Sequence, residues 1–145
     1  SITLREIARL KEGSDILRES GEELSFEELT YLPYFPRSFA YCSDTAPFPE
    51  LACWIKGVDL LYHEATFLDD NIKTAELTYH STARQAAGTA RDAGAKKLVI
   101  GHFSSRYKDL SLYETEAKDI FADTAIAREG MVIDIPIKKN NFNEE

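Results

Sequence analysis

The chain has 145 residues, enough for one ordinary domain that buries its own apolar core. Its net charge of −8 argues against a broad basic surface for a nucleic-acid backbone, although whole-chain charge does not exclude a local cationic pocket. Cys42 and Cys53 are too few for a disulfide framework, and no apolar run reaches the roughly 20 residues that span a bilayer. We therefore expect a soluble, cytoplasmic chain with no membrane partner, in which both thiols are buried and structural.

Residues 1–37 carry helix-start signals but nothing that resembles a ligand set. Thr3 and Glu6 have the spacing of a capping box that opens a short helix ending near Gly13, and Ser25 and Glu28 repeat the signal. We interpret residues 1–37 as a lead-in segment of the same domain as residues 38–145.

From residue 38 onward, short apolar runs alternate with helical patterns. The predicted order is strand 38–43, helix 49–56, strand 58–63, helix 82–93, strand 97–101, helix 110–122 and strand 131–135. Alanines at helical spacing give the helix at 82–93 a small-residue face that allows close packing on a sheet, and Gly94 is placed to end it. This alternation predicts an α/β fold with functional groups at strand ends.

All three histidines fall within about forty residues, and each follows an apolar run that we interpret as a strand. Imidazole is the commonest metal ligand and titrates near neutral pH, so their grouping suggests a metal-assisted hydrolytic site. His63 points away from Glu64 if the strand continues through both residues. We assign His63 a structural role or a role in supporting the ligands.

Asp44 and His102 are the candidate metal ligands. Asp44 follows a strand, and a carboxylate there can bridge two cations or simply turn the chain by binding backbone amides. His102 follows Gly101, which lets the backbone approach a neighbouring element closely; the ring can ligate a metal or be satisfied by backbone groups.

Glu64 and His80 form a candidate proton-handling pair, because a carboxylate that accepts a hydrogen bond from an imidazole raises its basicity. The alternative is a capping carboxylate and a histidine that merely precedes the start of a helix. Ser104, Ser105 and Arg106 supply two hydroxyls and a guanidinium suited to phosphate oxygens.

Four motifs together, in this order and spacing, closely resemble ribonuclease Z, the tRNA 3′-processing family of the metallo-β-lactamase superfamily. They are Ala-Tyr-Cys-Ser-Asp-Thr (40–45), His-Glu-Ala-Thr (63–66), His-Ser-Thr (80–82) and Gly-His-Phe-Ser-Ser-Arg-Tyr (101–107). The resemblance implies the C-terminal half of an αββα sandwich. It also implies a hydrolase that cuts precursor tRNA after the discriminator nucleotide and leaves a 3′-hydroxyl.

The resemblance also implies residue roles. Asp44 is similar to the aspartate that bridges two zinc ions, and His102 to the last histidine ligand. Glu64 and His80 match the pair that transfers a proton to the leaving 3′ oxygen, and Ser104, Ser105 and Arg106 match the stretch beside the scissile phosphate.

The His-x-His-x-Asp-His motif of this family, which supplies most zinc ligands, does not occur in the chain. Because an open zinc site needs about three protein ligands, we expect the chain alone to be inactive and to bind zinc weakly or not at all. The chain begins with serine and its only methionine is Met131, which suggests a piece of a longer protein whose missing N-terminal half is its partner. Half of a sandwich leaves an apolar face uncovered, so we also expect a homodimer.

Two other functions stay open. One is a different hydrolase of the same superfamily that acts on a small phosphodiester or ester, and the other is a non-catalytic assembly domain with structural histidines. A free-standing RNA-binding module is disfavoured, because the chain is acidic and has no aromatic and basic surface motif.

Overall fold

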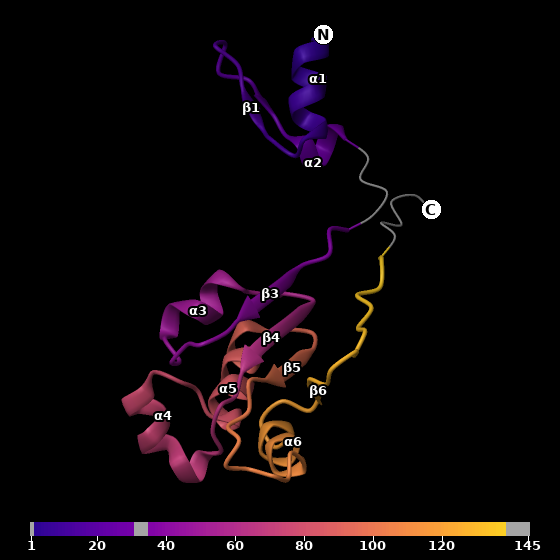
Figure 1. Cartoon of the computed structure of the whole chain (residues 1–145). Coiled ribbons are helices and arrows are strands. Elements are labelled where there is room, and N and C mark those ends of the chain that lie inside the picture. Colours follow the sequence, from indigo (N-terminus) through magenta and orange to yellow (C-terminus); the bar gives the residue numbers. More distant parts are fainter. Residues whose placement is uncertain (1, 31–34, 139–145) are drawn as a thin grey trace. The chain divides into compact units, whose positions relative to one another are not determined.

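The structure is a computed structural model that describes residues 2–30 and 35–138. Residue contacts divide the chain into two compact units (Figure 1). The first comprises Ser1–Phe35 with Ile137–Glu145, and the second comprises Pro36–Pro136. The assignment of residues 1–37 to the same domain as the rest stays a prediction.

The first unit is built from helix α1 (Leu4–Lys11), strands β1 (Ile16–Leu17) and β2 (Glu23–Leu24), and the short helix α2 (Phe26–Leu29). The predicted capping box opens α1, since the Thr3 side chain and the Glu6 side chain each bind the other's backbone N–H. The second capping box is wrong: Ser25 precedes α2 but makes no side-chain cap. Asp15 takes that place, because its Oδ1 accepts from the Phe26 N–H at 2.8 Å.

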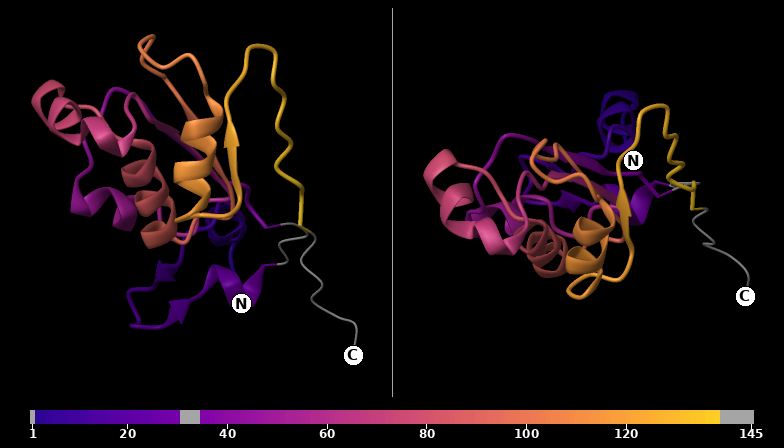
Figure 2. Two further views of the ribbon diagram at one scale, coloured as in Figure 1. Left: turned by 90° about the horizontal axis from the view of Figure 1, so that it is seen from below. Right: turned by 60° about the horizontal axis from the view of Figure 1, so that its bottom comes forward.

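The second unit contains a four-stranded parallel sheet, which confirms the α/β class. Its strands lie in the order β3 (Phe39–Cys42), β4 (Leu60–Glu64), β5 (Leu98–Gly101) and β6 (Thr124–Ile126). Helices α3 (Pro49–Trp54), α5 (Ala83–Ala93) and α6 (Ser111–Lys118) connect them and pack together beside the sheet (Figures 1 and 2). Because neighbouring strands are parallel, all four present their carboxyl ends at the same edge of the sheet.

Helix α5 is the central packing element, and its sequence explains why. The Thr82 side chain and Gln85 form a capping box at its start, and Gly94 ends it at a left-handed φ of 62°. The predicted alanine face is confirmed, since all five of its alanines are buried: Ala83, Ala86, Ala87, Ala90 and Ala93. The first four of them pack with apolar side chains of the strands and of α6 in one core cluster.

The predicted last strand at 131–135 is wrong, because the fourth strand is β6. Thr124 and Ile126 pair with β5 and are buried, so β6 already occupies the position beside β5 that the predicted strand would take. Val132 is 85% exposed. In Figure 2 the segment after β6, drawn in yellow, runs outside the sheet.

Two further elements were not predicted, the 3-10 turn η1 (Asp69–Asn71) and helix α4 (Ile72–Thr78). They lie between β4 and α5, and α4 has only one buried residue, Ala75, which leaves little apolar periodicity to detect. His80 therefore follows a helix and not a strand, so its predicted position at a strand end is wrong. The expectation of two buried thiols also fails, because Cys53 is exposed on α3 while Cys42 is half-buried.

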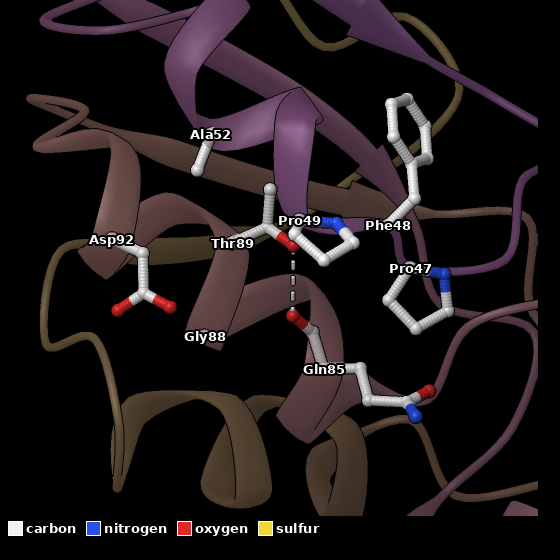
Figure 3. A pocket seen from close by; sticks show the side chains of 8 residues that line it. All are labelled: Pro47, Phe48, Pro49, Ala52, Gln85, Gly88, Thr89 and Asp92. Carbon is white, nitrogen blue, oxygen red and sulfur yellow. Dashed lines mark hydrogen bonds between the residues drawn. The ribbon is translucent and has the colours of Figure 1, made fainter.

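A pocket of about 300 Å³ lies between α3 and α5 (Figure 3). It is lined by Pro47, Phe48, Pro49, Ala52, Gln85, Gly88, Thr89 and Asp92. None of these is a predicted site residue. Within residues 2–30 and 35–138, no helix combines the length and the apolar character needed to cross a membrane.

Candidate metal centre

The predicted ligands and the proton-handling pair meet at the carboxyl edge of the sheet. Glu64 is the last residue of β4, Asp44 lies two residues beyond β3, and His102 directly follows β5. His80 reaches the same place from the connection between α4 and α5. Asp44, His80 and His102 each offer one ligand atom, and these three atoms lie within 4.8 Å of one another.

Backbone strain is concentrated at this edge. Asp44, Tyr79 and His102 have left-handed φ angles of 50°, 58° and 61°, and they are the non-glycine residues with positive φ in the described parts of the chain. Such conformations are rare for residues with a Cβ and gather at functional sites, where surrounding contacts hold them. Two of the three are the predicted ligands, and Tyr79 immediately precedes His80.

Gly101 explains how His102 comes so close to the sheet. A Cβ atom at Gly101 would lie only 2.9 Å from the ring atom Cζ of Tyr62 on the adjacent strand. No side chain fits there without displacing the Tyr62 phenol. The expected close approach before His102 is therefore confirmed.

The Glu64 carboxylate is the buried anion of the site. Its side chain is fully buried and accepts hydrogen bonds from His80 Nδ1 (2.8 Å), the Thr66 hydroxyl (2.6 Å), and the Thr45 and Thr66 backbone amides (3.1 and 2.9 Å). Burial acts to raise the pKa of Glu64, but hydrogen bonds from Thr66 and His80 outweigh it and leave the pKa below its usual value. Glu64 thus caps the loop and also pairs with His80, so both sequence interpretations describe its contacts.

Sequence reasoning missed two hydroxyls that join the site loops. Thr66 Oγ1 lies 2.6 Å from Glu64 Oε2 and 2.9 Å from His102 Nδ1, and Ser81 Oγ donates to the Thr45 carbonyl at 2.7 Å. Both residues are buried. The available signal was their place inside the His-Glu-Ala-Thr and His-Ser-Thr motifs.

His63 lies apart from this cluster. Its side chain is fully buried, and its Nδ1 lies 2.7 Å from the Glu64 carbonyl oxygen, which can only accept a hydrogen bond. Burial lowers the pKa of His63, and its Nε2 has no hydrogen-bond partner among the described residues. The ring is therefore placed as a neutral buried group, and its structural or supporting role stays a prediction.

The predicted phosphate-binding residues follow His102 in the chain. Ser104 anchors the loop through its N–H to the Thr66 carbonyl at 3.0 Å, and Ser105 and Arg106 are exposed. The Arg106 guanidinium lies 5.2 Å from the ring centroid of Phe67, which contacts the His80 ring edge-on at 6.2 Å. A cationic group is thus held near the histidines by stacking on an aromatic face.

The donor set suits a divalent metal ion. His102 Nε2 and Asp44 Oδ1 lie 3.2 Å apart. Zinc binds histidine nitrogen and carboxylate oxygen at about 2.0–2.2 Å, which places two tetrahedral ligand atoms roughly 3.4 Å from each other. The His80 atom Nδ1 is 4.0 Å from the same Asp44 oxygen but is already bonded to Glu64.

The chain is similar to several known proteins. The family model described as the beta-lactamase superfamily domain matches residues 33–103. The protein named Ribonuclease Z of Bacteroides fragilis is 45% identical over 134 residues, which cover 92% of this chain and 44% of that protein. The metallo-beta-lactamase fold protein YhfI of Bacillus subtilis aligns with a TM-score of 0.60 at 25% identity, covering 65% of this chain and 38% of its own.

A human protein, the short form of tRNase Z, aligns at 33% identity with a TM-score of 0.50, covering 66% of this chain and 31% of its own. The chain thus carries part of a metallo-β-lactamase-type domain. It is similar to the proteins named Ribonuclease Z over most of its own length and spans less than half the length of these curated relatives.

Proposed function

We propose that the chain is part of a zinc-dependent endoribonuclease that hydrolyses precursor tRNA after the discriminator nucleotide, removes the 3′ trailer and leaves a 3′-hydroxyl on the tRNA. The observation that carries this proposal is the convergence of Asp44, His80 and His102 around the buried Glu64 carboxylate. The relatives named Ribonuclease Z support the substrate class.

Asp44 Oδ1 and His102 Nε2 are the atoms that would hold metal, in a site that contains two zinc ions in the whole protein. Bound zinc would lower the pKa of a water molecule and polarise the phosphate. The other ligands come from the missing N-terminal half of the same protein. With too few ligands of its own, the chain alone is inactive and binds zinc weakly or not at all.

His80 would protonate the leaving 3′ oxygen. Its Nδ1–H donates to Glu64 at 2.8 Å, which fixes the ring orientation and leaves Nε2 as the atom that exchanges a proton with substrate. The buried negative charge of Glu64 also stabilises the protonated ring before transfer. The pair therefore performs general acid catalysis.

Ser104, Ser105 and Arg106 would bind the phosphate oxygens beside the scissile bond. A planar guanidinium binds two such oxygens at once, and its stacking on Phe67 keeps it on the side of His80. A local cation of this kind would let a chain with a net charge of −8 bind phosphate.

The open face of the sheet supports two partner proposals. Phe39 and Tyr41 of β3 are 57% and 64% exposed, and Tyr41 stacks on Tyr62 at 4.6 Å between ring centroids. We propose that the missing N-terminal half covers this aromatic surface in the whole protein. We also propose that the chain alone forms a homodimer through it. Separately, we propose that the protein works in the cytoplasm without a membrane partner. A monomeric mass by light scattering would contradict the dimer.

One rival function has an observation in its favour. This rival is a different hydrolase of the same superfamily. In its favour, the structure aligns with YhfI at a higher TM-score than with human tRNase Z. Under this rival function, the site would act on a small phosphodiester. A non-catalytic assembly domain remains the second rival.

The test is cleavage of a 3′-extended precursor tRNA by the full-length protein loaded with zinc, compared with hydrolysis of bis-p-nitrophenyl phosphate. We expect cleavage beside the discriminator, abolished by Asp44→Ala and by His80→Ala but retained by Glu76→Gln, a substitution of an exposed carboxylate on α4. Intact tRNA together with hydrolysed phosphodiester would favour the small-substrate hydrolase. No hydrolysis of either substrate would favour the assembly domain.

A further inference from the structure

The Thr66 hydroxyl lies between three polar side chains of the candidate metal centre. Its Oγ1 is 2.6 Å from Glu64 Oε2, 2.9 Å from His102 Nδ1 and 3.2 Å from His80 Nδ1. We propose that Thr66 is a positioning residue that fixes the tautomer of His102, so that the Nε2 lone pair faces Asp44 before any metal binds.

The direction of each hydrogen bond follows from the chemistry of the groups. A hydroxyl has one hydrogen to donate, and an ionised carboxylate only accepts. The 2.6 Å separation from Glu64 Oε2 falls in the range of charge-assisted O–H···O⁻ bonds, so the Thr66 hydrogen points to Glu64. Thr66 Oγ1 can then only accept from His102, and the proton of the neutral ring lies on Nδ1.

This tautomer leaves two acceptor atoms facing each other. His102 Nε2 lies 3.2 Å from Asp44 Oδ1, and neither atom carries a hydrogen when the ring is neutral. A nitrogen lone pair and a carboxylate oxygen at this distance repel unless a cation lies between them. The hydrogen-bond chain that runs from Glu64 through Thr66 to His102 therefore orients the ligand atom toward the metal position.

The hydroxyl can be removed without moving the backbone that carries it. The Thr66 N–H donates to Glu64 at 2.9 Å, and its carbonyl accepts from the Ser104 N–H at 3.0 Å and from the Tyr113 hydroxyl at 2.9 Å. These three bonds remain in Thr66→Val, which has nearly the same shape as threonine. The variant thus tests the hydroxyl and not the loop.

The inference rests on the proposed metal-binding role of His102, and its test does not depend on RNA cleavage. The metal-free full-length protein is labelled with ¹⁵N-histidine, and the His102 signals are assigned by their loss in His102→Gln. Spectra are recorded at increasing alkaline pH until the ¹⁵N shifts of His102 no longer change, so that the neutral ring is observed. The ¹⁵N shifts and couplings then report which ring nitrogen carries the proton.

We expect the Nδ1–H tautomer of His102 in the wild type and in Thr66→Ser, and a shift toward Nε2–H in Thr66→Val, where Nε2 can donate to Asp44. Zinc affinity, measured by calorimetry, is expected to fall about 10- to 100-fold in Thr66→Val and to be restored in Thr66→Ser. The matched control is Thr124→Val, which removes a buried hydroxyl of β6 that donates to the Phe121 carbonyl. It should change neither readout.

An Nε2–H tautomer in the wild type would overturn the proposal, as would an unchanged tautomer in Thr66→Val. If Thr66→Val does not fold, the wild-type and Thr66→Ser spectra still decide between the two tautomers. Precursor tRNA left intact by a protein with the expected tautomer would defeat the proposed function and leave this inference standing.

Discussion

Leu98 of β5 and Glu64 of β4 are both fully buried on adjacent strands of one sheet, but different interactions stabilise them. Leu98 packs among the alanines of α5 in the core cluster, where shape and apolar area decide its contribution. Glu64 is held by hydrogen bonds to three loops, two of which contain a residue with a left-handed φ, Asp44 and Tyr79. The stability of the interior therefore depends on how well side-chain volume fills it, whereas the stability of the carboxyl edge depends on whether each polar atom has a hydrogen-bond partner.

The largest effect should come from the interior. Leu98→Ala removes a fully buried side chain and leaves a cavity, so we expect the free energy of unfolding to fall by about 2–5 kcal/mol. Denaturant titration measures the loss. Leu77→Ala on α4 is the matched control, since Leu77 is 82% exposed and should change stability by less than about 0.5 kcal/mol. Equal losses in the two variants would mean that the interior is not packed by volume.

The second prediction tests the polar edge with a substitution that keeps volume. Glu64→Gln places an amide NH₂ where two donors now point, so we expect a loss of about 1–3 kcal/mol in the free energy of unfolding. Glu76→Gln, the same change at an exposed position, should be neutral within about 0.5 kcal/mol. A neutral Glu64→Gln would show that shape alone holds this edge, as in the interior.

The same division decides what the sequence could predict. The alanine face of α5 follows from one helical period, and the strands up to β5 follow from apolar runs, so local pattern was enough for them. Helix α4 was missed because it buries only Ala75, and β6 was missed because the apolar run at 131–135 is longer than the three residues that pair with β5.

The site was predictable in its residue types but not in its contacts. Asp44, Glu64 and His102 stand at strand ends that parallel pairing brings together, and the motif resemblance named them. The Thr66 hydroxyl acts on His102, 36 positions away, across loops whose turns depend on left-handed residues. Nothing local in the sequence reports such a bond, because it exists only once three connections have folded.

A third prediction concerns His63, the fully buried residue that precedes Glu64 in β4. Burial lowers its pKa in the folded state, while the unfolded chain keeps the ordinary value of about 6.5. Below that pH the unfolded state binds a proton that the folded state does not, so stability falls with falling pH, by at most about 1.4 kcal/mol per pH unit.

Unfolding measured from pH 7.5 to 5.5 should therefore show a shallower decline in His63→Asn than in the wild type. Asparagine keeps a donor near the position of Nδ1 and cannot take up a proton in this range. Parallel stability curves for the two proteins would mean that His63 binds its proton equally in both states.

The smallest effect on stability should come from Asp44, a proposed metal ligand. Its side chain is 69% exposed, and asparagine tolerates the left-handed φ of 50° that this position requires. Asp44→Asn should therefore change the free energy of unfolding by less than about 0.5 kcal/mol, as Asp119→Asn should at another exposed position.

Zinc affinity of the full-length protein should separate these two variants. Asp44→Asn removes the charged oxygen that faces His102 Nε2, so we expect affinity to fall by more than about 10-fold, whereas Asp119→Asn leaves it unchanged. Unchanged affinity in Asp44→Asn would remove Asp44 from the ligand set. Contacts of the surrounding residues hold the fold at this edge, so Asp44 and His102 can keep unfavourable backbone angles. A proposed ligand can therefore contribute to metal binding without contributing to folding.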